Sequence, residues 1–327
     1  MKTENTSILQ LHDLSIGYRD SLISGINAEI KKGEIVLLAG KNGCGKTTLL
    51  KTIFKEIIPL AGSIKMLDLD INKIPISEIG KLISVVFSKS TVSPHLKVFD
   101  LISLGRYPYK RWYEKLTEKE IADINDILEL LELEKYRNYY VNELSDGNLQ
   151  KALTARALIQ DCPLLILDEP TSHLDISNKL EIMRIISHLA KEKNKTVLFT
   201  SHDLNLGLAV ADKLWLIKDN SLRSGFTEDL AYQEDILDYF AGESMKFDYN
   251  SNEYGFLSVE NKKSIRISGN SQSLYWLQKA LVRNGFLLTD HAEIMVMEKD
   301  PGFIVSHLGK EHFFSTIEKT LDFLHNI

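Results

Sequence analysis

Short apolar runs alternate with amphipathic stretches over the first 240 residues of the chain. The runs at 34–39 and 164–167 are continuous, as is typical of strands buried on both faces of a sheet. Residues 117–134 instead repeat with the helical period, which aligns Ile121, Ile124 and Leu128 on one face. This alternation of strands and helices predicts an α/β fold with a largely parallel sheet.

Other segments fit the same alternation. Residues 90–160 are expected to be mostly helical, as a helical subdomain. Further strands are predicted at 8–15, 23–30, 196–200 and 213–218, and further helices at 47–54, 178–191 and 205–211.

The pattern weakens beyond residue 240, where 244–255 are polar and are predicted to form a loop. We therefore expect a first domain over 1–245 and a small α/β domain over 246–327. The second domain matches no motif, which leaves a structural extension that covers the first domain or helps it dimerise, or a ligand-sensing regulatory domain. Its predicted elements are strands at 264–268, 286–289, 294–297 and 303–306, and helices at 272–283 and 311–324.

Composition narrows the function classes. The net charge of −6 argues against a protein held mainly by nucleic-acid phosphates. Cys44 and Cys162 are the two cysteines, too few for a disulfide framework or a zinc site. No apolar run approaches the roughly 20 residues of a membrane-spanning helix, and residues 1–15 lack the apolar core of a signal peptide. If the protein works at a membrane, another chain must supply the spans.

Residues 40–47 read Gly-Lys-Asn-Gly-Cys-Gly-Lys-Thr, which fits the phosphate-binding loop G-x-x-x-x-G-K-[ST]. The glycines allow backbone N–H groups to turn toward phosphates, and the helix predicted to follow points its positive end at the same charge. Lys46 can reach the β- and γ-phosphates, and the Thr47 hydroxyl can ligate Mg²⁺. The placement between a buried strand and a helix argues against a chance glycine-rich turn.

Two further motifs follow in the chain. Asp168 and Glu169 come directly after the apolar run 164–167, at the sheet edge where ligands bind in open α/β folds. There Asp168 would hold Mg²⁺ and Glu169 would polarise the water that attacks the γ-phosphate. Residues 144–148, Leu-Ser-Asp-Gly-Asn, place Ser145 and Gly147 just ahead of a predicted helix, where they can offer a hydroxyl and N–H groups to an anion.

Taken together, these motifs resemble those of the ATP-binding subunits of ATP-binding cassette (ABC) transporters, over residues 8–240. Residues 40–47 match the Walker A loop and 164–169 the Walker B strand. Residues 144–148 correspond to the LSGGQ signature, from which they depart at Asp146 and Asn148. Residues 172–175 are similar to the D-loop, and His202 matches the switch histidine that contacts the γ-phosphate. Tyr18 stands where the family stacks an aromatic ring on adenine.

The resemblance implies a P-loop ABC ATPase domain with a mixed sheet, an inserted helical subdomain, and ATP and Mg²⁺ as cofactors. It implies a head-to-tail homodimer in which Ser145 and Gly147 serve the partner's nucleotide. Catalysis falls to Glu169 and His202, and the Mg²⁺ ligands are Thr47, Asp168 and Ser88. The residues assigned to ATP are Tyr18, Gly40, Lys41, Asn42, Gly43, Cys44, Gly45, Lys46, Thr47, Thr48, Ser145, Gly147 and Asp175.

The branch of the family is indicated by residues 104–109, Leu-Gly-Arg-Tyr-Pro-Tyr, which resemble a GRxP segment of ATPases that serve iron-siderophore, haem and cobalamin permeases. The resemblance thus implies a bacterial importer subunit, peripheral at the cytoplasmic face of the inner membrane, with permease subunits and a substrate-binding protein as partners. Three alternatives are less consistent with the sequence. A DNA-repair ATPase would contain a long coiled coil, and a ribosome-associated protein would contain two cassettes, whereas this chain has no heptads and one phosphate loop. A metabolic kinase would lack the signature and the switch histidine.

Two positions depart from expectation. The family places a glutamine where this chain has Ser88, and a serine side chain is shorter and lacks the amide. Ser88 is expected to reach the metal through a water molecule, unless the loop shifts and Ser90 takes the role. Cys44 lies inside the phosphate loop. Either the N–H groups of the loop favour its reactive thiolate form, or the side chain is buried and inert.

Overall fold

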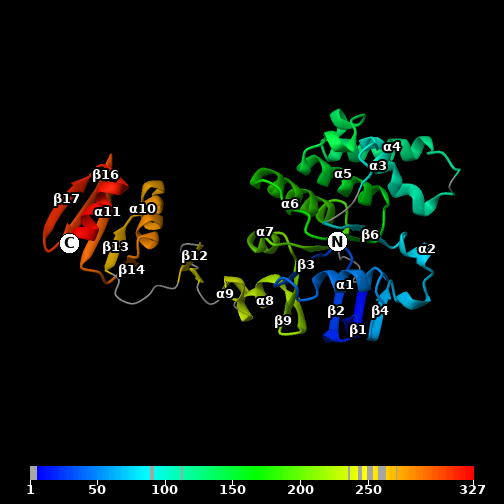
Figure 1. The fold of residues 1–327 in the computed structure, drawn as a ribbon, viewed down its shortest axis with the longest axis horizontal. Helices are drawn as coiled ribbons and strands as arrows, with labels where there is room; N and C mark the ends of the chain where they lie inside the picture. Colours follow the sequence, from blue (N-terminus) through cyan, green and yellow to red (C-terminus); the bar gives the residue numbers. More distant parts are fainter. Residues whose placement is uncertain are drawn as a thin grey trace. The chain divides into compact units, whose positions relative to one another are not determined.

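The computed structural model of the chain describes residues 6–88, 92–111, 113–234, 236–241, 245–248, 253–256, 263–269 and 271–327. The chain divides into two compact units, Met1–Ile236 and Leu237–Ile327, called here the cassette unit and the C-terminal unit (Figure 1). Each unit has its own hydrophobic core.

A six-stranded sheet with the order β10-β9-β3-β8-β7-β6 forms the centre of the cassette unit. Its strands are parallel except β10, which pairs with β9 in the antiparallel sense. Strands β3, β7 and β8 are buried along their whole length, as their continuous apolar runs predict. The strands are β3 (Ile35–Gly40), β6 (Ile83–Val86), β7 (Leu164–Leu167), β8 (Thr196–Thr200), β9 (Lys213–Lys218) and β10 (Ser221–Phe226).

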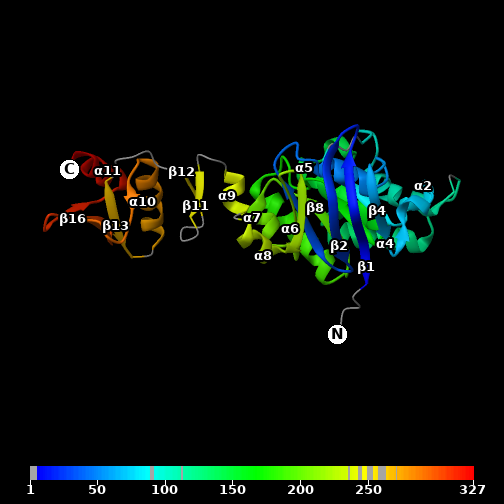
Figure 2. The ribbon, with the colours of Figure 1, turned by 90° about the horizontal axis from the view of Figure 1, so that it is seen from below.

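The central sheet is largely parallel, as predicted, and the cassette unit also contains a second, four-stranded antiparallel sheet. The strands predicted at 8–15 and 23–30 form an antiparallel sheet of their own, because a tight turn between Gly17 and Ser21 joins them (Figure 2). Its order is β2-β1-β4-β5, and helix α1 (Lys46–Ile53) contacts both β1 and β3. The strands are β1 (Ser7–Gly17), β2 (Ser21–Lys31), β4 (Ala61–Met66) and β5 (Leu69–Asp70).

The segment expected to be mostly helical is a helical region in which α5 packs against α3 and α4 (Figure 1). Helix α4 starts at a capping box made by Thr117 and Glu120 and buries Ile124 and Leu128. It stops earlier than predicted, because the chain turns at Glu132 with a φ of 56°. The elements are α3 (Val98–Ser103), η2 (Leu104–Tyr109), α4 (Glu118–Leu130), η3 (Glu134–Tyr136), η4 (Val141–Glu143) and α5 (Asp146–Ile159).

The remaining helices connect these strands or follow the last of them, and α9 crosses the boundary between the two units. Within the described residues, no helix is long and apolar enough to cross a membrane. These helices are η1 (Ile71–Lys73), α2 (Ile76–Ile79), α6 (Ile176–Lys191), α7 (Leu204–Leu208), α8 (Thr227–Gln233) and α9 (Ile236–Ala241).

The C-terminal unit contains a five-stranded sheet with the order β14-β13-β15-β16-β17. Two helices pack on it, and Leu277, Leu281 and Leu324 from these helices meet Val296 and Val305 from the strands in its core. The elements are β13 (Ser264–Ser268), α10 (Gln272–Arg283), β14 (Leu287–Leu288), β15 (Ile294–Lys299), β16 (Gly302–His307), β17 (Lys310–Phe314) and α11 (Ile317–Asn326).

Two predictions for this end of the chain are wrong. The segment predicted as a loop pairs into a hairpin, β11 (Met245–Asp248) with β12 (Glu253–Phe256). The first part of the helix predicted at 311–324 is strand β17, because a turn at Leu308 and Gly309, both with positive φ, folds the chain back onto β16. Helix α11 begins only after Thr316, whose side chain caps it.

Candidate functional site

The loop between β3 and α1 has the backbone that phosphate binding requires. Gly43 and Gly45 have φ values of 78° and 106°, which favour glycine. No side chain caps the first turn of α1, so its N–H groups can bind an anion. Lys46 is buried, and its Nζ donates to the carbonyl oxygens of Gly40 at 2.7 Å and Lys41 at 3.2 Å. The Lys46 ammonium therefore lies against the same loop.

Asp168 and Glu169 follow β7 and are held by Thr200 at the end of the neighbouring strand β8. The Thr200 hydroxyl donates to Asp168 Oδ1 at 2.9 Å and accepts from the Glu169 backbone N–H at 2.7 Å. Glu169 has a φ of 52°, an uncommon conformation for a residue with a side chain, and such strain concentrates at functional sites. One hydroxyl thus fixes the positions of both acidic residues.

The two carboxylates have different surroundings. Burial raises the pKa of Asp168 above its ordinary value, and hydrogen bonds from Thr200 and Ser88 and the charge of Lys46 oppose that rise. These contacts bring Ser88 and Lys46, which lie far from Asp168 in the sequence, next to its carboxylate.

Glu169 is the better exposed of the two acidic residues and faces the switch histidine predicted from the sequence. Its Oε1 lies 2.7 Å from His202 Nε2, and its Oε2 accepts a hydrogen bond from Ser172 at 3.0 Å. The His202 side chain is half exposed. Glu169 therefore has a partner on each carboxylate oxygen and stays open to solvent.

Tyr18 lies in the turn between β1 and β2, and 69% of it is exposed. Strand β2 leaves this turn and passes close to the phosphate loop. Its residue Ile23 lies so near that a methyl group added at Gly45 would be 3.3 Å from Ile23 Cδ1. This arrangement places an exposed aromatic ring in a turn whose outgoing strand contacts the loop.

The signature residues are carried by the helical region rather than by the phosphate loop. Ser145 caps α5 by accepting a hydrogen bond from the Asn148 N–H at 3.4 Å. A side chain at Gly147 would clash with Asn178 of α6, at distances of 2.6–2.9 Å. Asp175 caps α6 by accepting from Asn178 N–H at 2.8 Å, which lowers the pKa of Asp175. Ser145, Gly147 and Asp175 therefore belong to one packed α5–α6 pair.

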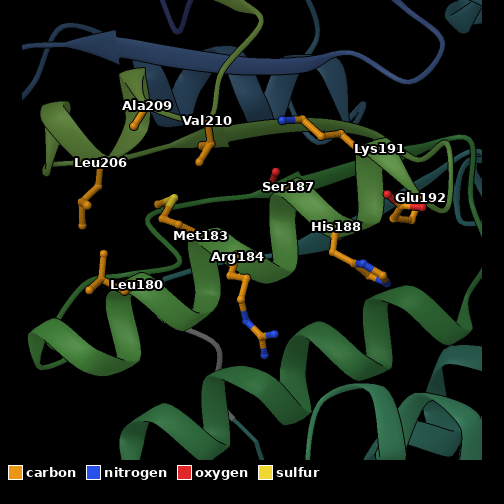
Figure 3. A pocket seen from close by; sticks show the side chains of 10 residues that line it. All are labelled: Leu180, Met183, Arg184, Ser187, His188, Lys191, Glu192, Leu206, Ala209 and Val210. Atoms are coloured by element: carbon orange, nitrogen blue, oxygen red, sulfur yellow. The ribbon is translucent and has the colours of Figure 1, made fainter.

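A pocket that the sequence did not predict lies between α6 and α7 (Figure 3). None of the predicted site residues lines it, so it is separate from the phosphate loop and the acidic pair. Its lining residues are Leu180, Met183, Arg184, Ser187, His188, Lys191, Glu192, Leu206, Ala209 and Val210.

The two departures noted in the sequence have different outcomes. Cys44 packs against the hydrophobic core, and a methyl group at Gly40 would lie 2.5 Å from its Sγ, so the structure favours the inward-facing, inert interpretation. Ser88 is exposed and its hydroxyl bonds to Asp168. The alternative residue, Ser90, lies outside the described residues.

Sequence reasoning missed two residues that the structure places at the acidic pair, Thr200 and Ser172. The parallel register pairs Leu167 with Phe199, so the residue after each lies at the same sheet edge. Both strands were predicted, but their pairing, which would have indicated Thr200, was not. Ser172 lies in the segment 172–175 that resembles the D-loop, but its contact with Glu169 depends on the turn between the two residues.

These groups fit the cofactors that the resemblance implies. An uncapped helix N-terminus and a lysine are suited to phosphate oxygens. A carboxylate flanked by the Ser88 and Thr200 hydroxyls is suited to a hard cation such as Mg²⁺.

Comparison with known proteins identifies the family. A family model described as ABC transporter matches residues 23–172, and one described as iron ABC transporter C-terminal domain matches residues 261–325. An uncharacterized ABC transporter ATP-binding protein of Methanocaldococcus jannaschii is 37% identical over 230 residues, which are 70% of this chain and 89% of that protein. The chain therefore belongs to the ABC transporter family, as one of its ATP-binding proteins.

Other relatives agree with this identification. The iron(3+)-hydroxamate import ATP-binding protein of Bacillus subtilis is 35% identical over 198 residues, 60% of this chain and 74% of that one. A transporter assigned to the metal-chelate type, solved in an inward-facing conformation, has a TM-score of 0.64 at 26% identity, covering 77% of this chain and 97% of its own. A dimeric bacterial ABC transporter cassette has a TM-score of 0.60 at 26% identity, covering 67% and 99%.

These neighbours confirm the predicted fold class, a cassette-type α/β ATPase. ATP-binding subunits of this family are ATPases that drive transport and work with permeases, so the predicted ATPase activity is confirmed as well. The comparisons do not favour a DNA-repair or ribosome-associated ATPase.

Proposed function

We propose that this chain hydrolyses ATP to power a bacterial importer of an iron-siderophore, haem or cobalamin. The convergence of Lys46, Asp168 and Glu169 on one sheet edge carries the hydrolytic half of this proposal. The match of residues 261–325 to an iron transporter domain and the iron-hydroxamate relative support an iron-containing cargo. The segment 104–109 supports the same branch.

In this proposal, the phosphates of ATP lie on the loop 40–45 and the first turn of α1. Lys46 exchanges its two carbonyl partners for phosphate oxygens, because its ammonium already lies against the loop. The exposed ring of Tyr18 stacks on the adenine. Backbone N–H groups from Lys41 to Gly45, together with Thr48, complete the contacts.

Mg²⁺, when bound, neutralises phosphate charge. Thr47 and Asp168 hold it in this proposal, and Ser88 contributes through its hydroxyl. The raised pKa of Asp168 marks a carboxylate whose negative charge lacks full compensation from the chain itself. A cation at this carboxylate would supply that compensation.

Glu169 orients and polarises the attacking water in the proposed reaction, and His202 contacts the γ-phosphate. The 2.7 Å approach of His202 Nε2 to Glu169 Oε1 places the two side chains side by side. Ser172 holds the other carboxylate oxygen, which limits the rotation of the Glu169 side chain. Glu169 thus has the exposure that a water-activating group needs and a restricted set of orientations.

The signature and D-loop residues serve a second copy of the chain. Ser145, Gly147 and Asp175 lie on the α5–α6 pair, whereas the phosphate loop lies beside β1 and β3. A head-to-tail homodimer would bring the signature of one copy to the ATP of the other, and the dimeric structure of a related cassette supports the formation of a dimer. ATP would then close the dimer and hydrolysis would reopen it.

The wider assembly follows from the family. We infer a nucleotide-binding domain over 1–245, with its helical subdomain at 90–160, and an extension over 246–327. Permease subunits would hold the cassette at the cytoplasmic face of the inner membrane, and a substrate-binding protein would deliver the cargo to them.

The test is to co-express the chain with a candidate permease pair, reconstitute the complex in vesicles and measure ATP hydrolysis with each loaded binding protein. A ferric siderophore, haem or cobalamin should stimulate hydrolysis at least several-fold over the unloaded binding protein. The Glu169→Gln complex is the matched control, because it binds ATP without turnover. Stimulation by none of these cargoes, with another class active, would contradict the proposed substrate group.

A further inference from the structure

One face of the sheet in the C-terminal unit mixes apolar and charged side chains, and α10 and α11 pack against the other face. Alternate residues along its strands point to opposite faces. The face toward α10 and α11 carries Ile265, Ile294, Val296, Phe303 and Val305, all buried in the core. The opposite face, called here the open face, carries Leu287, Met295, Met297, Ile304 and Phe313.

The exposure of these side chains agrees with this assignment. Phe313 and Leu287 are 50% and 48% exposed, and Met295, Met297 and Ile304 are half-buried among their strand neighbours. A sheet face that meets water normally carries polar residues in alternation with the core. The open face also carries polar residues, Arg266, Ser268, Ser306 and Glu311, but five apolar side chains among them are more than such a face needs in water.

The strand register arranges the open face in rows across the sheet. One row runs Arg266, Met295, Ser306 and Glu311, and the next runs Ser268, Met297, Ile304 and Phe313. A positive and a negative side chain thus stand at opposite ends of the first row. They are three strand spacings apart, about 14 Å, so they cannot pair within one copy. Within the described residues neither has an ion-pair partner.

We propose that the open face is an isologous interface with the open face of a second copy of this chain. A two-fold axis parallel to the strands, between β15 and β16, reverses each row against itself. Arg266 of each copy then opposes Glu311 of the other, and Met297 opposes Ile304. The first row therefore meets its own reverse with opposite charges at both ends, and the second row brings Met297 and Ile304 together near the axis. Met295 faces Ser306, and Ser268 faces Phe313. Aligned sheets pack about 10 Å apart, which such side chains span.

The size of the face explains how this pairing would work. A sheet face about 24 Å wide and 15 Å long offers a few hundred Å², less than the roughly 800 Å² per partner of a stable free complex. Pairing is therefore weak between separate chains and becomes favourable when a cassette dimer tethers two copies. This last step rests on the proposed head-to-tail dimer.

The experiment uses the full chain with Met297→Cys and a short bis-maleimide, because the two copies of residue 297 lie on either side of the axis. Cross-linked dimer should form, above the background of the parent chain with Cys44 and Cys162. Adding Arg266→Glu or Glu311→Arg places like charges at both ends of the interface and should slow cross-linking about tenfold.

The decisive step is to mix the Arg266→Glu and Glu311→Arg chains, one of them enlarged by a tag. Each mixed pair regains an opposite-charge contact at both ends, so heterodimers should cross-link at the parent rate while each homodimer stays slow. No effect on the folding of a single chain produces this rescue. Lys319→Glu and Asp322→Arg, on the exposed side of α11, are the matched controls and should leave the rate unchanged.

Two results would overturn the inference. Absence of rescue in the mixture would exclude the two-fold pairing. Protection of the thiol introduced at position 297 from a small maleimide, without any cross-linked dimer, would show that the same chain's cassette unit covers the face. ATP hydrolysis of the same variants separates this inference from the proposed function. Arg266 and Glu311 lie outside the ATPase machinery. If the parent chain and all variants failed to hydrolyse ATP, that result would refute the proposed function and not the interface.

Discussion

The central sheet of the cassette unit and the sheet of the C-terminal unit bury their strands differently. Neighbouring residues Leu165 and Ile166 of β7 point to opposite faces, and both are buried. Neighbouring residues Val296 and Met297 of β15 also point to opposite faces, but only Val296 is fully buried. In the first sheet, both faces of the strands are buried, which accounts for every apolar residue in a run. In the second sheet, the helices of the C-terminal unit bury the apolar residues of one face only.

This difference in burial accompanies a difference in the roles we propose for the two sheets, catalysis for the first and assembly for the second. The doubly covered sheet is rigid enough to hold Asp168 and Glu169 at the ends of its strands, where small displacements matter for catalysis. The singly covered sheet carries no group placed in the reaction and leaves a surface for another molecule. Four predictions address this contrast, from the largest expected effect to the smallest.

The largest effects belong to the edge of the doubly covered sheet. Lys46→Ala should abolish ATP binding and hydrolysis, because it removes the charge opposite the phosphates. Glu169→Gln should retain ATP binding and lower the hydrolysis rate at least 100-fold, since it removes the carboxylate that orients water. Equilibrium nucleotide binding and steady-state hydrolysis measure the two effects separately. Hydrolysis by Glu169→Gln at the parent rate would refute its assigned role.

The two faces of the second sheet can be compared directly by substitution. Val296→Asp buries an unpaired charge and should destabilise the C-terminal unit by about 3–5 kcal/mol. Met297→Asp, one residue on, should change its unfolding free energy by less than about 1 kcal/mol. In the cassette unit, both Leu165→Asp and Ile166→Asp should be severely destabilising. Denaturant unfolding monitored by hydrogen exchange in each unit tests all four, and equal losses at 296 and 297 would remove the contrast.

Asp168→Asn should raise stability while it abolishes turnover. Burial raises the pKa of Asp168, so the folded chain disfavours its ionised form. The stability associated with the protonated group is present below its ordinary pKa of 3.8 and is lost as the pH rises through the folded-state value. The gain from asparagine should therefore increase with pH through the acidic range and level off once Asp168 is ionised in both the folded and the unfolded state. Thermal unfolding from pH 3 to pH 7 measures it, and a constant difference would contradict the cause.

The smallest effect concerns Ser88, whose hydroxyl contacts Asp168. Ser88→Gln restores the longer amide that the family places there, and it should raise basal hydrolysis or permease stimulation a few-fold. Steady-state rates with and without permease compare the two chains. Identical rates would show that Ser88 does not limit the coupling between the metal site and the helical region.

The strands that are buried on both faces were the most predictable part of the fold. Strands β3, β7 and β8 lie at their predicted positions, because a short, continuous apolar run bounded by turn residues is typical of a buried strand. Strand β10 is only partly buried at its edge of the sheet, and its sequence Ser-Leu-Arg-Ser-Gly-Phe carries little apolar signal. The pattern predicts a helix where strand β17 lies, since the exposed polar residues of that strand fit either period.

The candidate site divides in the same way. Lys46, Asp168, Glu169 and His202 could be predicted because their motifs combine chemistry with position. The contact between Gly147 and Asn178 could not, since it depends on how closely α5 approaches α6. The same holds for the self-complementary rows of the open face, which exist only once the strand register is known.

The Thr200 hydroxyl forms a directional chain, from the Glu169 N–H through the threonine O–H to the Asp168 carboxylate. Hydrogen bonds in such a chain polarise one another, so the strength of each depends on the charge at its end. A cation that draws electron density from Asp168 would weaken the bond that Asp168 accepts and, through it, the bond that fixes the Glu169 backbone. If a cation binds Asp168 as proposed, its effect would therefore reach the Glu169 backbone through one oxygen atom, without any movement of a domain.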